Sequence, residues 1–347
     1  MITKLIAKNW KLIAAIAGLG VVREAMKRWK SIDLQGKVVL ITGGSRGLGL
    51  AMAEEFAQQG TKLVICSREE DELVRASRHL SEFEAELLAV PCDITNPEQV
   101  QRLVEQATAR FGCIDVVVNN AGVISVGPWQ TLTRADFEEA MNSMFWGIYN
   151  TTMAVLPQMT ARKSGRIVNI TSIGGKVSVP HLLPYCSAKF AAVGFSEGLR
   201  AELAKDGISV VTVVPGLMRT GSPINAFMKG ERHSEEYTLF SLLDALPLTS
   251  ISAKRAAKQI VNATRRGEAE LIISVQAQLA ARLHGAFPGL ITDMLAVLNR
   301  FLPSGEAAGT ARYTGKESET PITQSFLTGL SKQASQQYNE NSSSTPS

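Results

Sequence analysis

The sequence predicts an α/β fold: a doubly wound, parallel sheet of seven strands in a single main domain. Three observations lead to this prediction. Between about residues 35 and 275, short apolar runs alternate with longer segments of helical pattern, as in successive βαβ units. A glycine-rich turn follows the first apolar run. The length of 347 residues, with 45% hydrophobic and 20% charged residues, is that of an ordinary globular chain with a large core.

The predicted strands are short apolar runs, and the predicted helices are the segments between and after them. The strands span residues 37–42, 62–66, 86–90, 114–120, 165–171, 208–214 and 270–275. The helices span residues 51–59, 69 onward, 97–111, about 134–159, 184–205, 253–266, and from the last strand to about 302. Asn96 and Pro97 are typical N-cap and first-turn residues of the third helix, and Gly60 ends the first.

Four regions follow from this pattern. Residues 1–34 form a basic and apolar N-terminal segment, and residues 35–280 form the main domain. Within that domain, residues 216–250 show no clear period and predict a long loop with short helices beside the substrate. Residues 281–330 predict a helical extension. Residues 331–347 are rich in Ser, Gln and Asn, and we expect them to be disordered.

The net charge of +4 is unevenly distributed along the chain. Residues 1–30 contain seven basic residues and one acidic residue, a local charge of +6, which leaves −2 for the rest. The main domain lacks the basic excess that neutralises nucleic-acid phosphates, so we expect no nucleic-acid partner. The four cysteines lack the spacing and histidine partners of a metal site, and we expect reduced thiols and no bound metal.

The basic N-terminal segment contains an apolar run, residues 12–22, that would span only about 16 Å as a helix. That length alone does not cross a hydrocarbon core of about 30 Å. A short or monotopic membrane anchor is the favoured interpretation, and a solvated basic helix or a cleaved signal are the alternatives. We therefore expect the protein at the cytoplasmic face of a membrane, or otherwise in the cytoplasm.

The turn TGGSRGLG, from Thr42 to Gly49, joins the first strand to the first helix. Its glycines allow close approach of the backbone to a ligand, and the helix N-terminus offers unpaired N–H groups to a diphosphate. The spacing is not the general G-x-G-x-x-G pattern, so the position between strand and helix carries the prediction. We expect a dinucleotide to contact Gly43, Ser45, Arg46, Gly47, Leu48 and Gly49.

The end of the second strand indicates which dinucleotide binds. An acidic residue there would hold the ribose 2′-hydroxyl of NAD and repel a 2′-phosphate. Here Ser67 and Arg68 take that place, with no acid before Glu69, and Arg46 lies in the glycine turn. Two guanidinium groups can share one phosphate through paired hydrogen bonds. We therefore predict NADP(H), with two solvent-exposed arginines as the alternative.

Tyr185 and Lys189 are four residues apart and lie on one face of a predicted helix. A nearby ammonium group favours the phenolate and lowers the pKa of a phenol, which suits Tyr185 to general acid and base catalysis. Ser172 ends the fifth strand at the same edge of the sheet, where its hydroxyl can polarise a substrate carbonyl. Together with the glycine turn, these three residues predict a catalytic site.

These motifs, in this order, resemble the short-chain dehydrogenase/reductase family, which has a Rossmann-type fold. The resemblance covers about residues 35–275 and includes Asn119-Asn120-Ala121-Gly122 after the fourth strand and Pro215-Gly216 with Thr220 after the sixth. It implies hydride transfer between the cofactor and a carbonyl or alcohol carbon, with Tyr185 moving the proton, Ser172 holding the oxygen and Lys189 binding the nicotinamide ribose. It also implies cofactor contacts at Asp93, Ile94, Asn120, Ala121, Gly122, Pro215, Gly216 and Thr220.

One position departs from the family pattern. Many members carry an asparagine three residues before a glycine in the long helix, as part of a proton relay through the lysine. Here Gly147 matches the glycine, and Met144 stands in the asparagine's place. A thioether cannot donate a hydrogen bond, and on an α-helix Asn142 would point elsewhere. This departure motivates a rival hypothesis, a non-catalytic dinucleotide-binding scaffold or redox sensor.

The favoured substrate is a small apolar carbonyl or alcohol, and the resemblance suggests a homodimer or homotetramer. Aromatic and aliphatic residues predict an apolar wall. They are Trp129, Phe145, Trp146, His181, Leu182, Leu183, Met218, Phe227, Tyr237 and Phe240. The alternative is that most of these side chains belong to the core or to a dimer interface.

Overall fold

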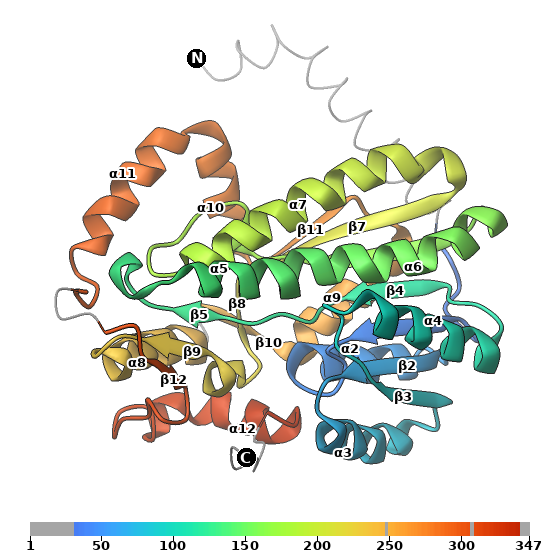
Figure 1. Ribbon diagram of the computed structural model, residues 1–347, viewed down its shortest axis with the longest axis horizontal. Coiled ribbons are helices and arrows are strands. Elements are labelled where there is room, and N and C mark those ends of the chain that lie inside the picture. The colour runs from blue at the N-terminus through green and yellow to red at the C-terminus, as the bar shows by residue number, and fades with distance from the viewer. Residues whose placement is uncertain (1–30, 247–248, 306–308, 341–347) are drawn as a thin grey trace, which may run out of the picture.

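In the computed structural model, a parallel seven-stranded sheet runs through the protein with helices on both faces (Figure 1). The structure describes residues 31–246, 249–305 and 309–340. The strand order is β11-β7-β6-β4-β1-β2-β3, which confirms the predicted doubly wound sheet. Its strands are β1 (Val38–Thr42), β2 (Lys62–Ser67), β3 (Leu87–Pro91), β4 (Val116–Asn119), β6 (Gly165–Ile170), β7 (Ile208–Pro215) and β11 (Glu270–Ile273).

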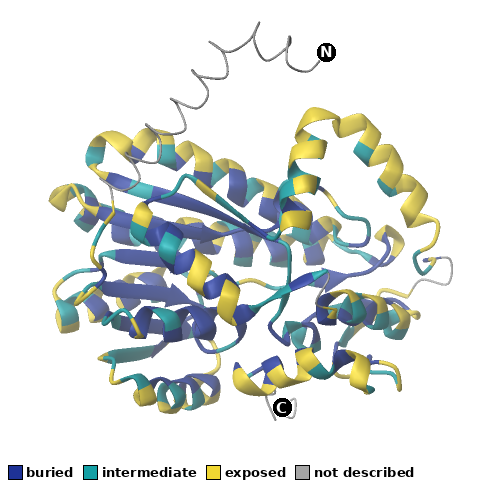
Figure 2. Ribbon diagram, turned by 180° about the vertical axis from the view of Figure 1, so that it is seen from behind, coloured by how far each residue is buried: buried dark blue, intermediate teal, exposed yellow. Residues whose placement is uncertain are grey.

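A hydrophobic core lies on each face of the sheet, because alternate strand residues point to opposite sides. Val39 and Ile41 of β1 join the core under one group of helices, and Val38 and Leu40 join the other. The first group is α2 (Gly47–Ala57), α3 (Glu70–Leu80) and α9 (Ala253–Arg266). The second is α4 (Pro97–Phe111), α6 (Gly147–Arg162) and α7 (Leu183–Leu203). Figure 2 shows the strands as the most deeply buried layer.

The expected long helix over residues 134–159 is interrupted. α5 (Arg134–Met141) and α6 are joined by a π-helical stretch, Asn142–Trp146. A π-helical stretch widens the turn and redirects the side chains that it contains. The predicted cap of α4 is confirmed, since the Asn96 side chain accepts hydrogen bonds from the backbone N–H groups of Glu98 and Gln99.

The segment expected to be a long loop contains more structure than predicted. It comprises β8 (Leu217–Arg219), β9 (Phe227–Lys229) and α8 (His233–Ala245), followed by β10 (Ser250–Ser252). β9 pairs with β5 (Ser125–Val126) and with β12 (Arg312–Thr314), and β8 pairs with β10. These short pairings join segments that are distant in sequence, which local sequence patterns do not reveal.

The C-terminal region begins with the expected helices, α10 (Val275–Ala286) and α11 (Pro288–Asn299). The expectation of disorder after residue 330 is wrong for the described part, because α12 (Gly329–Gln337) is helical and leads into residues 338–340. Ala334 and Tyr338 are buried in the same core cluster as Leu48 of α2, and this apolar burial holds the segment in place. Residues 341–347 lie outside the described residues.

The predicted membrane segment lies almost entirely outside the described residues, which begin at Ser31. Among the residues that the structure does describe, no helix is both long and apolar enough to cross a membrane.

Candidate active site

A cavity of about 770 Å³ opens at the carboxyl ends of the central strands. Its wall includes Ser172, Tyr185 and Lys189 together with almost every residue predicted to contact a dinucleotide. These cofactor-side residues are Gly43, Ser45, Arg46, Gly47, Leu48, Ser67, Arg68, Asp93, Ile94, Asn120, Ala121, Gly122, Pro215, Gly216 and Thr220. The structure therefore brings residues from seven separate segments to one site, and only Gly49 of the predicted set is not on the wall.

Gly49 lies beneath the cavity, where it packs against Gly43 at the other end of the glycine turn. A Cβ atom at Gly49 would lie 1.9 Å from the carbonyl oxygen of Gly43, which is closer than two non-bonded heavy atoms can approach. Gly43 has a φ of +62° and lies against the backbone of Ala121, and Gly47 has a φ of +55°. Only glycine fits these positions, so no side chain of these three residues covers the backbone N–H groups of the turn.

Hydrogen bonds hold the glycine turn against the Asn-Ala-Gly segment after β4. The Thr42 hydroxyl accepts from the backbone N–H groups of Asn120 and Ala121, at 2.9 and 3.1 Å. In return, the Asn120 side-chain amide donates to the carbonyl oxygens of Thr42 and Gly43, at 3.1 and 3.2 Å. The floor of the cavity is therefore fixed before any ligand binds.

The three predicted catalytic residues lie together at one end of the cavity. The hydroxyl of Tyr185 is hydrogen-bonded to Ser172, whose Oγ also accepts from the Gly174 N–H at 3.0 Å. The Lys189 Nζ donates to the carbonyl oxygen of Ile170 at 2.9 Å and lies 5.7 Å from the centre of the Tyr185 ring. Ser172 follows the end of β6, and Tyr185 and Lys189 lie in the first two turns of α7.

Comparison with known proteins decides the family. The sequence model of the protein family described as short chain dehydrogenase matches residues 37–229, more than half of the chain. The chain belongs to the short-chain dehydrogenase family. It is 37% identical over 254 residues to a dehydrogenase/reductase SDR family protein 7-like of Anopheles gambiae, an alignment that covers 72% of this chain and 78% of that protein.

Two further relatives show how far the similarity extends. A putative oxidoreductase, SadH, of Mycobacterium tuberculosis is 32% identical over 259 residues, covering 73% of this chain and 93% of its own length. The crystal structure of L-sorbose reductase from Gluconobacter frateurii, complexed with NADPH and L-sorbose, superposes with a TM-score of 0.62 and 28% identity. That match covers 70% of this chain and 97% of the reductase. The family is one of oxidoreductases that bind a nicotinamide dinucleotide and act on carbonyl and alcohol groups.

Burial determines the protonation states of Tyr185 and Lys189, the predicted catalytic pair in this short-chain dehydrogenase. It raises the pKa of the Tyr185 phenol to about 12, and the hydrogen bond from Ser172 only partly opposes this effect. Burial also lowers the pKa of Lys189 to about 8. The expected lowering of the phenol pKa by the ammonium group is not seen here, because desolvation of both groups dominates. At neutral pH the phenol is protonated and able to donate.

Met144 lies beside the predicted catalytic pair. Its side chain is fully buried in a cluster with Ala140 and Ala188, against which Tyr185 packs, and it lies against Gly122. Asn142, which a regular α-helix would direct elsewhere, borders the same cavity from the π-helical stretch. The asparagine of the family's relay therefore has no counterpart at position 144, although an amide is present nearby.

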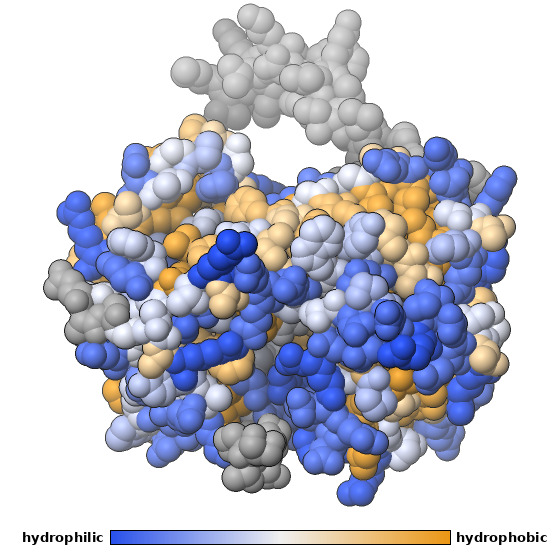
Figure 3. All heavy atoms as spheres, in the orientation of Figure 1, coloured by the Kyte–Doolittle hydropathy of each residue, from blue (hydrophilic) through white to orange (hydrophobic). Residues whose placement is uncertain are grey.

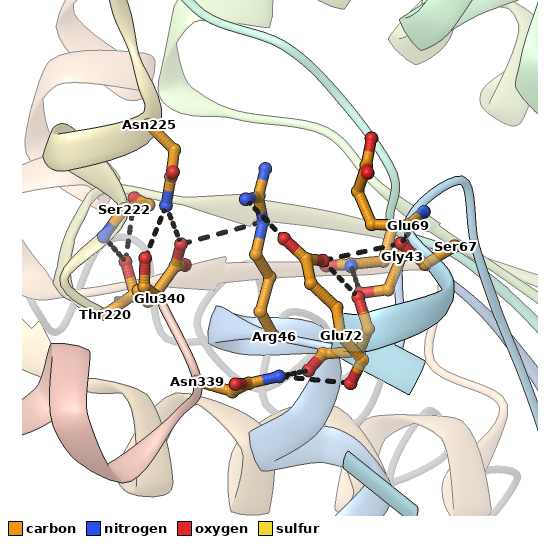
Figure 4. Close-up of polar contacts among 12 residues, drawn as sticks. Gly43, Arg46, Ser67, Glu69, Glu72, Thr220, Ser222, Asn225, Asn339 and Glu340 are labelled. Atoms are coloured by element: carbon orange, nitrogen blue, oxygen red, sulfur yellow. Dashed lines mark hydrogen bonds and ion pairs between the residues drawn. The ribbon is translucent and has the colours of Figure 1, made fainter. Parts of the chain in front are cut away.

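A carboxylate that sequence reasoning missed lies at the opposite end of the cavity (Figure 4). The buried Glu72 of α3 accepts a hydrogen bond from Ser45 Oγ at 2.8 Å and pairs with the Arg46 guanidinium at 3.0 Å. Ser67 Oγ lies 3.5 Å from the same carboxylate. Arg46 and Arg68 both line the cavity, as predicted, but the guanidinium of Arg46 already has an acidic partner. No local motif distinguishes Glu72 from the other acids in this charged helix.

The predicted apolar substrate wall is mostly wrong. Of its members, Met218 and Phe227 line the cavity. Tyr237 packs instead in a separate buried cluster, Trp129 is 69% exposed, and His181 is buried in a pair with Glu236 at 2.5 Å. The remaining predicted members that do not line the cavity are Phe145, Trp146, Leu182, Leu183 and Phe240. The outer wall instead includes Ile124, Glu138, Glu139, Ser143 and Thr314, a mixture of apolar and polar groups.

Proposed function

We propose that the protein is an NADP(H)-dependent oxidoreductase that transfers hydride between nicotinamide and a small, mainly apolar carbonyl or alcohol substrate. The observation that carries the proposal is that Ser172, Tyr185 and Lys189 share one cavity with a glycine turn in which a Cβ atom at Gly49 would collide with the backbone of Gly43. This turn fits a dinucleotide diphosphate, because its glycines offer backbone donors and have no side chains of their own. The bound cofactor supplies the hydride at its nicotinamide ring.

The chain's own residues handle the substrate oxygen and the proton. In carbonyl reduction, the Ser172 hydroxyl hydrogen-bonds the carbonyl oxygen and polarises it. Tyr185 then donates its phenol proton to the oxygen as negative charge develops there. The Lys189 ammonium stabilises the resulting phenolate and binds the hydroxyls of the nicotinamide ribose. In alcohol oxidation the same groups act in reverse, and Tyr185 accepts the proton.

The charge of Lys189 predicts how the rate depends on pH. Since its pKa is about 8, the ammonium fraction falls as the pH rises through that value. The neutral amine no longer stabilises a phenolate, so we expect kcat/KM for carbonyl reduction to fall above about pH 8. Lys189→Arg keeps its charge and should move this decline to higher pH at a lower maximal rate. A pH–rate profile of the natural protein and of Lys189→Arg checks these two expectations. A decline at the same pH in the two proteins would contradict the role assigned to Lys189.

The choice of NADP(H) depends on Arg46 and Arg68, which line the cavity near the end of β2. We expect Arg46→Ala to weaken NADPH binding by about tenfold or more, because a charged hydrogen bond to the 2′-phosphate is lost and Glu72 is left unpaired. NADH binding should change little. Titration of both dinucleotides measures the effect, with Arg134→Ala on the exposed surface of α5 as the control. Equal loss of NADH and NADPH affinity would contradict a 2′-phosphate contact.

The substrate class can be tested directly with a panel of aldehydes, ketones and quinones of increasing apolar length and NADPH. Met218, Phe227 and Ile124 provide apolar contacts at the outer cavity, and Glu138 and Glu139 provide polar ones. We expect turnover to rise with a short hydrocarbon chain beside the carbonyl. Tight NADPH binding without turnover of any carbonyl would favour the rival function, a dinucleotide-binding scaffold or redox sensor, which the buried Met144 motivates.

We also propose that the N-terminal segment holds the protein at the cytoplasmic face of a membrane. The local charge of +6 beside an apolar run supports attraction to anionic lipid. Exposed apolar side chains on α10, on α11 and at the residue between them add to this support; they include Leu279, Phe287, Leu290, Met294 and Val297. We expect the full chain in the membrane fraction and a variant starting at Ile32 to be depleted from it. Equal distribution of the two would contradict the anchor.

We also propose that the protein associates into a homodimer or homotetramer, because it exposes aromatic side chains on one face. Apolar side chains gather over α6 and α7 on the face shown in Figure 3. Trp146, Tyr149 and Phe190 are each exposed by more than a third, and the rings of Trp146 and Tyr149 are in contact. Exposed aromatic side chains in contact with one another are typical of protein–protein interfaces.

A further inference from the structure

The last described residues of the chain lie across the glycine turn, and we call residues 338–340 the C-terminal strap. The N–H of Gly47, at the start of α2, donates to the carbonyl oxygen of Tyr338 at 2.8 Å. The Asn339 side-chain amide donates to the carbonyl oxygen of Ser45 at 2.9 Å and to that of Glu72 at 3.2 Å. The strap therefore occupies backbone groups of the turn that is predicted to hold the cofactor.

Glu340, the end of the strap, places a carboxylate at the cavity wall (Figure 4). It is 3% exposed, accepts a hydrogen bond from Asn225 Nδ2 at 2.6 Å, and lies 3.7 Å from the Nε atom of Arg46. A Cβ atom on Gly47 would lie 2.3 Å from its Oε1 atom. The carboxylate thus bridges the glycine turn and the segment that follows β8, directly above a position where only glycine fits.

Glu340 contacts the kinds of groups that a dinucleotide diphosphate needs. A diphosphate is stabilised by the positive end of a helix and by amide donors. Here the N-terminus of α2 and Asn225 face the Glu340 carboxylate, and Arg46, which we assign to the 2′-phosphate, lies 3.7 Å from it. Two anions that share one buried site repel each other strongly. A bound diphosphate and the docked carboxylate are therefore incompatible.

The docked position is also costly for the carboxylate itself. Burial raises the pKa of Glu340 to about 7, and the nearby Glu72 adds to this rise, while Arg46 and Asn225 oppose it. The ion pair with Arg46 is shared with Glu72, which is the closer partner at 3.0 Å. The strap is held chiefly by the buried Tyr338 ring and by Asn339, and the Glu340 carboxylate itself gains little.

We propose that the C-terminal strap is a built-in competitor of the dinucleotide, with Glu340 occupying the place of its diphosphate. This inference rests on the proposed function, because it concerns the regulation of the same cofactor site. Binding of the cofactor displaces the strap, and docking of the strap lowers the apparent affinity for the cofactor by the fraction of molecules in which the site is covered.

Dissociation constants for NADPH test the proposal. Asn339→Ala removes the hydrogen bonds to the carbonyl oxygens of Ser45 and Glu72 and so favours the undocked strap. We expect this variant to bind NADPH about tenfold more tightly than the natural protein does. Asn299→Ala, the same substitution on the exposed surface of α11, should leave the affinity unchanged. An affinity of Asn339→Ala that is equal to or weaker than that of the natural protein would overturn the competition.

A second measurement shows whether the strap competes with the cofactor or instead covers the bound cofactor. The N–H groups of Tyr338 and Glu340 donate to the carbonyl oxygens of Ala334 and Ser335, so their hydrogen exchange reports on the docked strap. NADPH should accelerate exchange in residues 334–340 of the natural protein if the cofactor displaces the strap. Slower exchange with NADPH would overturn the proposal. If neither the natural protein nor any variant binds NADPH or NADH, the proposed function itself fails, and the inference fails with it.

Discussion

Tyr185→Phe should lower carbonyl reduction by about 10³-fold while changing the dissociation constant for NADPH by less than about twofold. The substitution removes one hydroxyl, the group hydrogen-bonded to Ser172, and leaves the ring that packs beside Met144 in place. The substrate oxygen then has no proton donor at the distance that Tyr185 provides. Single-turnover kinetics of NADPH oxidation, combined with a binding titration, separate the loss of the chemical step from any loss of the cofactor.

The matched control for this experiment is Tyr149→Phe. Tyr149 is 38% exposed on α6, and its hydroxyl has no part in the predicted chemistry. We expect this variant to retain the natural rate. If Tyr185→Phe also turned over at the natural rate, Tyr185 would not be the proton donor, and the roles of Ser172 and Lys189 would have to be reassigned.

Gly49→Ala should have the largest effect of any small substitution on both folding and cofactor binding. The added methyl group would lie 1.9 Å from the carbonyl oxygen of Gly43, so the glycine turn must move. We expect a loss of about 3 kcal/mol in the free energy of unfolding, as is typical of overpacked sites. NADPH affinity should fall by at least about tenfold, since the glycine turn at Gly43 is displaced from the position that a diphosphate needs.

Gly198→Ala provides the control for the glycine substitution. Gly198 lies within α7, and a Cβ atom there would meet no other atom within 4 Å. In this position alanine should stabilise the protein by about 0.5–1 kcal/mol, because it lowers the conformational entropy of the unfolded chain. Denaturant unfolding of both variants measures the contrast. A Gly49→Ala variant as stable as the natural protein would contradict the described packing of the turn.

The fold could be predicted because short stretches of sequence determine its strands and helices. Each strand of the sheet is a short apolar run, and signals such as Gly60 after the first helix and Asn96 before the third mark where the helices end and begin. The features that escaped prediction depend on contacts between distant segments. β9 pairs with β5 and β12, which lie about a hundred residues before it and over eighty after it. The π-helical stretch at Asn142–Trp146 likewise has no marker in the apolar pattern.

The residues predicted for the cofactor end gather at one cavity for the same reason. The glycine turn and the residues after β4 and β7 are short motifs at strand ends, and parallel strands bring all their carboxyl ends to one edge. The substrate end was predicted poorly, because an apolar residue such as Tyr237 serves equally well in a core. The strap was missed because residues 331–340 have a polar composition, and only the burial of Ala334 and Tyr338 orders them.

The central claim is that this chain moves hydride between nicotinamide and a carbonyl carbon with Tyr185 as the proton donor. The most direct test uses NADPH that carries deuterium on the transferring face of the nicotinamide ring, together with the best carbonyl compound from the substrate panel. Mass spectrometry of the product alcohol should find one deuterium on the former carbonyl carbon, and a Tyr185→Phe reaction of equal duration should form about 10³-fold less of this deuterated alcohol. A product alcohol without deuterium from either face of the cofactor would contradict the account.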